Sequence, residues 1–292
     1  MSSTERPHIP GLLLRLAGPL QSWGEHSHFN DRDTLSFPSR SALTGLLAAA
    51  LGRPREHRLD DLDLIVTVRV DRPGSRLRDF HTVGGGLSGD RTVVTAEGKR
   101  RDSDTSTLTS TRWYLEDAAF TVALTLPDHT PPPTAWADAL RAPRWPLYLG
   151  RRSCPPAGPL LLGHSTDVLH DLVHLPLALR APTTNGTEQT TTVPVQFLSE
   201  MPLADLPAPG DQSDADPALN TGEDQHSTVL DTPVDFAPSH RRYRARPLYR
   251  RTLALPASQR AGYGTDQLAR LAAHTSPTYT PVADFTLEGS VQ

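Results

Sequence analysis

The residues that could transfer protons are few and scattered along the chain. Acid–base cleavage of an RNA phosphodiester needs a base, an acid and a cation near the developing charge. The chain has 12 histidines and a single lysine, Lys99. His81 ends a predicted strand near Arg78, where a base could stand, although a lone histidine in a strand is more often a hydrogen-bonded structural residue. Because no convincing acid–base pair emerges, we expect no catalytic residues.

Metal and cofactor patterns are equally weak. His26 and His28 lie two residues apart in a predicted loop without a third nearby ligand, which is a poor spacing for zinc. The glycine run at 84–86 lacks the helix and the Lys-Ser/Thr pair that a phosphate-binding loop requires. The single cysteine, Cys154, excludes an intramolecular disulfide and a cysteine-based zinc site. The sequence therefore predicts neither a metal nor a cofactor.

Anion binding is better provided for than proton transfer. Apart from Lys99, all of the 29 basic residues are arginines, and arginine stays charged, forks onto phosphate and stacks on bases. A GC-rich genome would also favour arginine over lysine, but the arginines are suited to anions whatever the cause of the bias. The net charge is −4, yet nine of the 33 acidic residues fall within residues 199–235, which contain no lysine or arginine. The rest of the chain has 29 basic and 24 acidic residues, a net charge of +5.

One arginine pair lies in a segment free of negative charge. Arg151 and Arg152 follow Tyr148 and Gly150 in a predicted tight loop, and residues 139–166 contain no acidic residue. We expect these guanidinium groups to be exposed and suited to phosphate, although a solvated basic loop would have the same sequence.

Aromatic and amide groups elsewhere could complete such a surface. Arg112, Trp113 and Tyr114 place a cation beside aromatic rings, as in proteins that bind single-stranded RNA, although at least one of the rings belongs in the core if the segment is a strand. Gln21 and Trp23 follow a predicted strand end, where a turn could present them to a ligand. A tryptophan in that position is more often a core residue.

The apolar pattern predicts the elements that position these residues. Strands are expected at residues 10–17, 65–70, 77–83, 119–126 and 160–163. Ser39 suits the N-cap of a helix covering residues 41–51, with Gly52 as its stop, and a shorter helix is expected near residues 136–140. This mixture indicates an α+β fold.

Other segments bury less or carry charge. Residues 83–111 are polar and form a long excursion, and residues 205–228 are acidic, interrupted by proline and expected to be disordered. Residues 241–255 carry six arginines in a strand-like alternation, whereas the tail at 256–292 has little to bury. No window of 18 apolar residues occurs, so we expect a cytoplasmic protein without a membrane partner.

Four blocks in order carry a resemblance to a known family. They are residues 14–24 (LRLAGPLQSWG), 37–47 (FPSRSALTGLL), 77–83 (LRDFHTV) and 148–155 (YLGRRSCP). Together they resemble the Cas-five subunits (RAMP superfamily) of the type I-E CRISPR Cascade complex. The likeness extends over about residues 11–180 and is thin afterwards.

The resemblance implies a ferredoxin-like (RRM-related, RAMP) domain over residues 8–130 with an inserted β-hairpin thumb at 83–111. A smaller C-terminal β-rich region would span 131–255, and the tail at 256–292 would be extra. In this family the subunit caps the foot of the complex and holds the 5′ handle of the CRISPR RNA. It also contacts the backbone subunit CasC and the large subunit CasA, so that target DNA is met indirectly through the complex.

The resemblance also bears on activity. In type I-E, cleavage of the precursor belongs to a separate subunit, CasE, while a related subtype uses this subunit as the ribonuclease with a Tyr/Lys/His set. Here Lys99 is followed by Arg100 and not by histidine, which argues against catalysis. The sequence thus favours a non-catalytic RNA-binding subunit, with a metal-independent endoribonuclease and a protein–protein adaptor as alternatives.

The expected RNA contacts combine phosphate and base recognition. Arg40 with the N-terminus of its helix could receive a phosphate because free backbone amides point there, and Arg112 could stack on a base or bind its edge. The full set of expected RNA-binding residues is Gln21, Trp23, Ser39, Arg40, Ser41, Arg78, His81, Arg112, Tyr148, Arg151 and Arg152.

Overall fold

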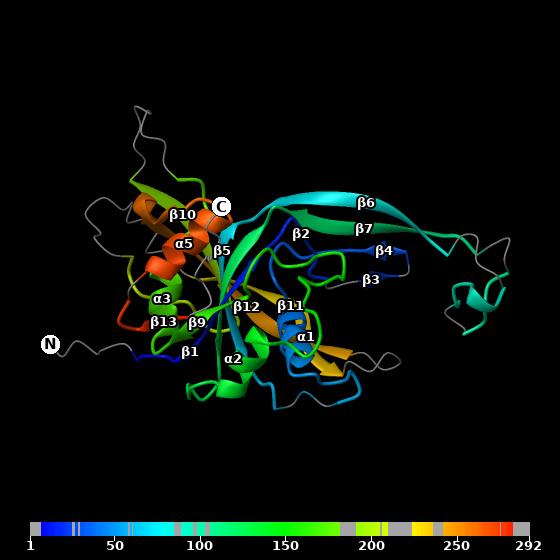
Figure 1. Cartoon of the computed structure of the whole chain (residues 1–292), viewed down its shortest axis with the longest axis horizontal. Coiled ribbons are helices and arrows are strands. Elements are labelled where there is room, and N and C mark those ends of the chain that lie inside the picture. Colours follow the sequence, from blue (N-terminus) through cyan, green and yellow to red (C-terminus); the bar gives the residue numbers. More distant parts are fainter. Residues whose placement is uncertain are drawn as a thin grey trace, which may run out of the picture.

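An eight-stranded antiparallel sheet runs through the molecule (Figure 1). The computed structural model describes residues 7–24, 27–28, 30–57, 59, 61–84, 89–95, 98–102, 106–181, 191–204, 206–209, 224–235, 242–274 and 276–282. In spatial order, the strands are β11 (Gln225–Asp235), β12 (Arg242–Pro256), β10 (Thr192–Ser199), β5 (Ile65–Arg72), β8 (Ala119–Thr125), β1 (Gly11–Ala17), β9 (Leu161–Ser165) and β13 (Tyr279–Pro281). This antiparallel sheet, together with the helices described in the next paragraphs, confirms the predicted α+β class.

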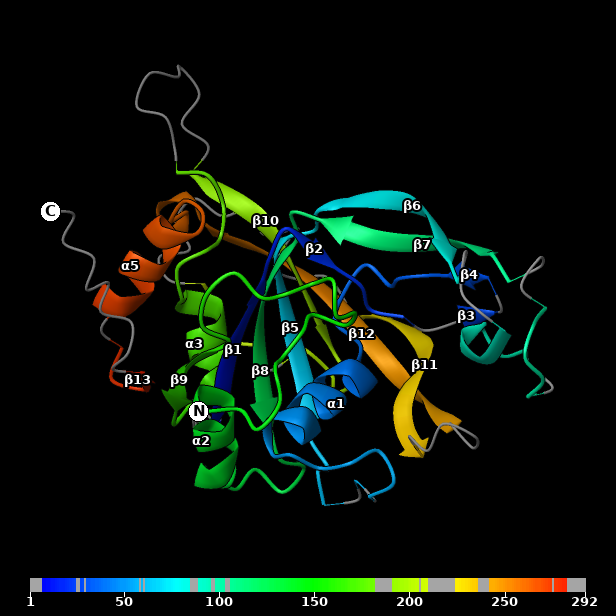
Figure 2. The same cartoon turned by 45° about the vertical axis from the view of Figure 1, so that its right-hand side comes forward.

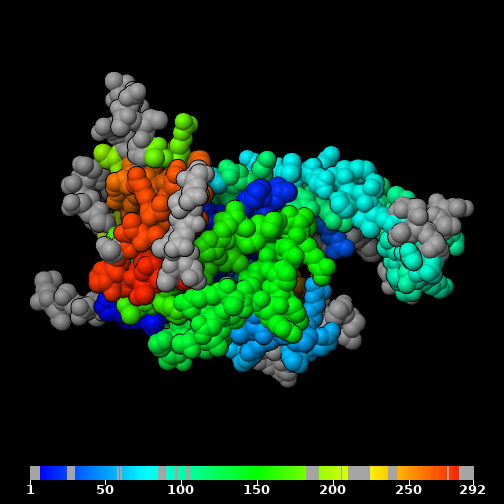
Figure 3. Space-filling model, viewed as in Figure 1, coloured from blue at the N-terminus to red at the C-terminus, as the bar shows by residue number. Residues whose placement is uncertain are grey.

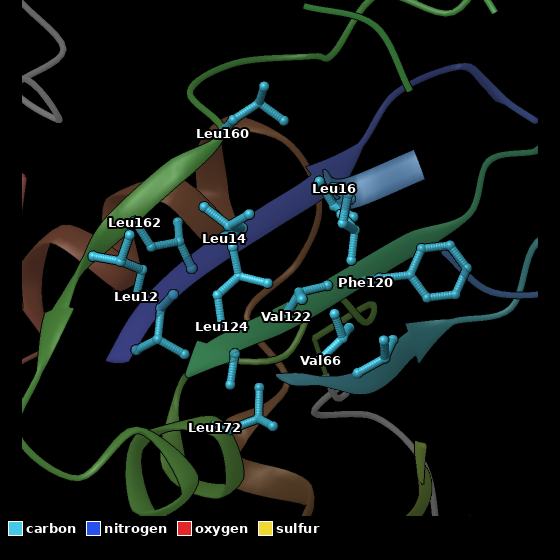
Figure 4. Close-up of a cluster of buried hydrophobic side chains, with 14 of the residues drawn as sticks. Leu12, Leu14, Leu16, Val66, Phe120, Val122, Leu124, Leu160, Leu162 and Leu172 are labelled. Carbon is cyan, nitrogen blue, oxygen red and sulfur yellow. The ribbon is translucent and has the colours of Figure 1, made fainter. Parts of the chain in front are cut away.

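The core of the sheet is built on β1, which is buried along its whole length. Its register with β8 pairs Leu12 with Leu124, Leu14 with Val122 and Leu16 with Phe120, and these side chains form part of one apolar cluster (Figure 4). Each fully buried leucine or phenylalanine contributes about 1.5–3 kcal/mol. The predicted strands at 10–17 and 119–126 are therefore confirmed.

The helices pack against this sheet. They are α1 (Arg40–Ala50), α2 (Thr134–Arg141), α3 (Val168–His174) and α5 (Thr265–Ala273), with short 3₁₀ turns η1 (Gly89–Arg91) and η4 (Ala257–Gln259). Ser39 caps α1 by accepting from the Ala42 amide at 3.3 Å, and Gly52 follows with a φ of +71°, which favours glycine. The helix predicted at 41–51 is thus confirmed within one residue.

Residues after 256 contribute to the core, contrary to expectation. Leu271 of α5 and Tyr279 of β13 are buried, and β13 extends the main sheet by pairing with β9. Gln267 accepts from the Arg15 Nε at 2.8 Å, and both side chains are buried. The tail has few apolar residues, but they are spaced so that one face of α5 is covered.

The predicted division at residue 130 is crossed by strand pairing. β10 pairs with β5 and β12, so the strands of the expected C-terminal β-rich region continue the same sheet. Within the predicted acidic insert, 205 and 210–223 lie outside the described residues, whereas Gln225–Asp235 form β11. No helix among the described residues is long and apolar enough to cross a membrane.

A second, five-stranded sheet carries a projecting hairpin. It contains β2 (Leu20–Gln21), β7 (Leu108–Glu116), β4 (Asp31–Arg32), β3 (Ser27–His28) and β6 (Ser75–Val83). The hairpin is formed by β6 and β7, which pair from Ser75–Glu116 to Val83–Leu108 and extend away from the body (Figures 1 and 3). The predicted excursion at 83–111 is its distal part, and the paired strands begin at the body.

Candidate nucleic-acid interface

A groove of about 1150 Å³ lies between α1, the loop at 145–152 and the base of the hairpin. Figure 2 shows this loop, in green, between α1 and the hairpin strands. Among the residues that the structure describes, six arginines and no acidic residue line the groove; the arginines are Arg32, Arg53, Arg55, Arg112, Arg151 and Arg152. Such a concave, one-signed surface focuses the electrostatic potential and attracts polyanions.

The loop is held by backbone bonds and one obligatory glycine. The Leu149 amide donates to the Cys154 carbonyl at 2.7 Å, and the Leu149 carbonyl accepts from the Ser22 amide at 3.0 Å. Gly150 has a φ of +95°, and a Cβ on it would lie 1.7 Å from the Ser22 carbonyl oxygen. Only glycine fits here, which explains the glycine before the two arginines.

Arg112, Tyr148 and Arg152 are brought together in the groove with Ser39 and Ser41, as the sequence led us to expect. Arg152 is exposed, and it forms no ion pair with any other described residue. Arg112 is half-buried, and its Nε donates to the Ser110 hydroxyl at 3.1 Å.

Arg151 has a structural role that the sequence did not predict. Its guanidinium donates to the carbonyls of Trp113 at 2.9 Å, Arg32 at 3.0 Å and Asp33 at 3.3 Å. It also lies 4.7 Å above the centre of the Tyr114 ring. Three of its five N–H donors thus hold backbone carbonyls, so that Arg151 clamps the loop to β7 and β4. The expected contact with phosphate stays a prediction for its remaining donors.

The expected phosphate site at the start of α1 is also filled. The Arg40 amide donates to the Asp231 carboxylate at 2.7 Å, and Arg246 binds the same carboxylate at 2.6 Å. The Arg40 guanidinium pairs with Glu200 at 2.5 Å and Asp63 at 2.6 Å. Burial raises the pKa of Glu200, although Arg40 opposes that shift. Carboxylates of the protein thus occupy the position predicted for phosphate.

Gln21 and Trp23 belong to the core, which corrects their assignment as RNA contacts. Both side chains are fully buried. The Gln21 Nε2 donates to the carbonyls of Leu16 and Ala118, and its Oε1 accepts from the Trp23 indole at 3.1 Å. This closed network joins the end of β1 to the second sheet and leaves no group for a ligand.

Arg78 and His81 lie on β6 and do not line the groove. The His81 Nδ1 is 3.4 Å from the Asp79 carboxylate, and both side chains are partly exposed. Ser39 is fully buried as the α1 cap, so only its neighbour Ser41 is partly accessible.

Several groove residues were not predicted from the sequence. Arg53 and Arg55 follow α1 directly, and Arg53 pairs with Asp61 at 2.6 Å. Trp145 lines the groove with 41% of its surface exposed, and its place in the acid-free segment at 139–166 could have drawn attention to it. No group of three or more metal-ligating side chains occurs in the part of the chain that the structure describes.

Comparison with known proteins shows the family to which the chain is similar. The family described as CRISPR-associated protein (Cas_Cas5) matches residues 11–249. The CRISPR system Cascade subunit CasD of Escherichia coli (strain K12) is 40% identical over 168 residues, which is 52% of this chain and 70% of CasD. A chain in a solved CRISPR RNA-guided surveillance complex is 42% identical, with a TM-score of 0.70 over 90% of this chain and 98% of that chain. The chain therefore belongs to the Cas5 family of CRISPR-associated proteins.

Proposed function

We propose that this chain is a non-catalytic subunit of a type I-E Cascade complex and that its basic groove holds the 5′ handle of the CRISPR RNA. The observation that carries the proposal is the groove itself, whose described lining has six arginines and no acidic residue. The likeness to CasD and to a chain of a surveillance complex supports the setting.

The groove chemistry suits a single RNA strand. Exposed Arg32, Arg55 and Arg152 are available to neutralise phosphates, while half-buried Arg112 presents a planar cation beside them. Arg151 shapes the wall of the groove, because both of its terminal nitrogens donate to backbone carbonyls. Phosphate contacts of this kind position the strand, and base contacts add sequence preference.

We infer that the central strands form a ferredoxin-like unit. The order β5-β8-β1-β9, with α1 between β1 and β5 and α2 between β8 and β9 in sequence, matches a βαββαβ arrangement. The β6–β7 hairpin is inserted between β5 and β8 and corresponds to the family's thumb. Its exposed Phe80 offers an apolar contact for a neighbouring subunit.

The family role further implies that the subunit caps the foot of the complex and contacts CasC and CasA. It also implies that target DNA is reached only through the assembled complex. Catalysis is not expected, because no histidine, lysine or carboxylate that could transfer a proton lines the described part of the groove. Incubation with labelled precursor RNA, with and without EDTA, tests this point: defined cleavage that His81→Ala abolishes would support the ribonuclease alternative.

The groove is tested by the salt dependence of RNA binding. Each phosphate neutralised on a single strand contributes about −0.7 to the slope of log affinity against log salt. Replacing Arg55 and Arg152 together by Ala should make that slope shallower by roughly 1.4 if each meets one phosphate. Fluorescence anisotropy of labelled handle RNA at several salt concentrations measures it.

A matched control removes the same charge elsewhere. Arg141 and Arg270 are exposed and do not line the groove, so Arg141→Ala with Arg270→Ala should leave the slope close to that of the parent. If the groove variant and this control behave alike, the groove is not the RNA site. The adaptor alternative, in which arginines face acidic partner surfaces, would then be favoured.

A further inference from the structure

Trp145 is the most exposed of the four tryptophans. Its exposed fraction is 41%, whereas Trp23 and Trp136 are 0% and 4% exposed and Trp113 is half-buried. Among the described residues its ring has neither an aromatic nor a cation–π partner, and its indole forms no hydrogen bond. A large ring left open to water inside a groove marks a contact surface more than a packing residue.

The backbone around Trp145 is fixed. The Arg144 amide donates to the Ala50 carbonyl at the end of α1 at 2.9 Å. The Arg144 side chain packs over Gly52, where a Cβ would lie 2.6 Å from the Arg144 Cγ. On the other side, Pro146 restricts the backbone and Leu147 is buried. The ring is therefore presented from an anchored segment, which lowers the entropy lost when a ligand orders it.

The surroundings of Trp145 specify the chemistry of its ligand. The ring shares its groove with Arg55 and Arg152, and no acidic side chain is among the described residues that line it. An apolar protein segment would gain nothing from these cations, whereas a single nucleic-acid strand offers both a planar base for the ring and phosphates for the arginines.

We propose that Trp145 is a stacking platform for an unpaired RNA base. The groove would then bind a single strand through a base as well as through phosphates. This inference rests on the proposed function and adds to it a residue that contacts a base and not a phosphate. Stacking accepts any base because every base has a π-face, so the platform would hold the strand in place without reading its sequence.

The test uses two synthetic RNA probes of equal length and charge. One is an oligoadenylate, and the other is its abasic counterpart, which keeps the ribose-phosphate backbone but has no bases. Trp145→Leu keeps an apolar side chain without a π-face, and Trp145→Phe keeps an aromatic ring. Tyr263→Leu is the matched control, because Tyr263 is 46% exposed but lies outside the groove lining.

The expected result is selective for bases. Trp145→Leu should weaken oligoadenylate binding by about 5- to 150-fold, the range expected for one stacked base. It should leave abasic binding and the salt slope unchanged. Trp145→Phe should retain most of the affinity, and Tyr263→Leu should match the parent.

Other outcomes separate this inference from the proposed function. If Trp145→Leu binds oligoadenylate like the parent, or weakens both probes equally, the platform is refuted while the groove stands on its arginine variants. If the parent binds neither probe, the platform fails, and the groove function is decided separately by the binding of labelled handle RNA. Should Trp145→Leu not fold, the parent decides the question, because equal affinity for oligoadenylate and for the abasic probe would refute a platform.

Discussion

Arg151 and Arg152 are adjacent and identical in type, yet the fold gives them different roles. The Arg151 guanidinium donates to backbone carbonyls of β7, of β4 and of the residue after β4. Arg152 is exposed at the groove and has no ion-pair partner among the described residues. One residue therefore supports the shape of the groove, and its neighbour supplies charge to it.

This difference predicts that the two alanine variants lower the free energy of unfolding by unequal amounts. Arg151→Ala removes the guanidinium donor from the Arg32 carbonyl and from the Trp113 carbonyl, which keeps the Ser22 hydroxyl as a donor. It should lower the free energy of unfolding by about 1.5–3 kcal/mol, as for hydrogen bonds to a charged group. Arg152→Ala should change it by about 0.5 kcal/mol at most, because it removes an exposed side chain. Urea denaturation measures both, and equal losses would contradict the clamp.

The sequence could not have separated these roles. The partners of Arg151 lie 38 and 119 positions away, and those of Arg40 lie 160 and 191 positions away in Glu200 and Asp231. Local patterns predict a basic loop and the exposure of Arg152 in it, because the exposure of a tight loop depends on nearby residues. They do not reveal which cations long-range contacts have already neutralised.

At the scale of elements, α3 and the end of α5 bring half-buried histidines together. The His170 and His174 rings stack with centroids 4.1 Å apart, and His274 ends α5 nearby. Burial lowers the pKa of His174 and of His274, while the Asp171 carboxylate opposes both shifts. His170 and, for His274, Arg69 add repulsion to the protonated forms.

These pKa shifts predict a loss of stability in mild acid. Because the folded pKa of each histidine lies below its unfolded value, the unfolded chain binds more protons as the pH falls below about 6.5, and the free energy of unfolding decreases. The loss is complete once the pH is below the folded pKa. Urea denaturation between pH 7 and pH 5 should show this decline in the parent and a shallower one in His174→Gln with His274→Gln. The same slope in both proteins would refute the assignment.

Elements with a regular apolar period were predicted well, and others were missed whatever their length. The 11 residues of β11 were not predicted, and Gln225–Thr228 lie in the segment expected to be disordered. The α1 helix and the strands β1, β5 and β8 have regular apolar periodicity, which reports burial directly. The α3 helix has seven residues, too few for a helical period to emerge, and was not predicted. β13 has only three residues and depends on β9 for its pairing, so nothing in its own sequence marks it as a strand.

At the scale of the whole molecule, the C-terminal segment completes a buried polar layer. Gln267 of α5 bonds to Arg15 of β1, whose Nη1 donates to the Ala157 carbonyl. Arg69 is fully buried and pairs with Asp71 at 2.6 Å in the same layer. Burying charged groups requires every partner to be present, so a segment beyond residues 11–249, which the family matches, has become part of the central sheet's support.

The C-terminal segment should therefore be required for stability and not for the charge of the groove. Leu271→Ala removes a side chain that is 1% exposed and should cost about 2–5 kcal/mol. Gln267→Ala should cost about 1–3 kcal/mol, because the buried Arg15 Nε loses its acceptor. Arg270→Ala, on the exposed side of the same helix, should be nearly neutral. At temperatures where the variants remain folded, all three should keep the parent's salt slope for RNA, since α5 and α1 lie apart in both views (Figures 1 and 2). If Leu271→Ala and Gln267→Ala have the same free energy of unfolding as the parent, the C-terminal segment does not support the fold, as its sparse apolar content first indicated.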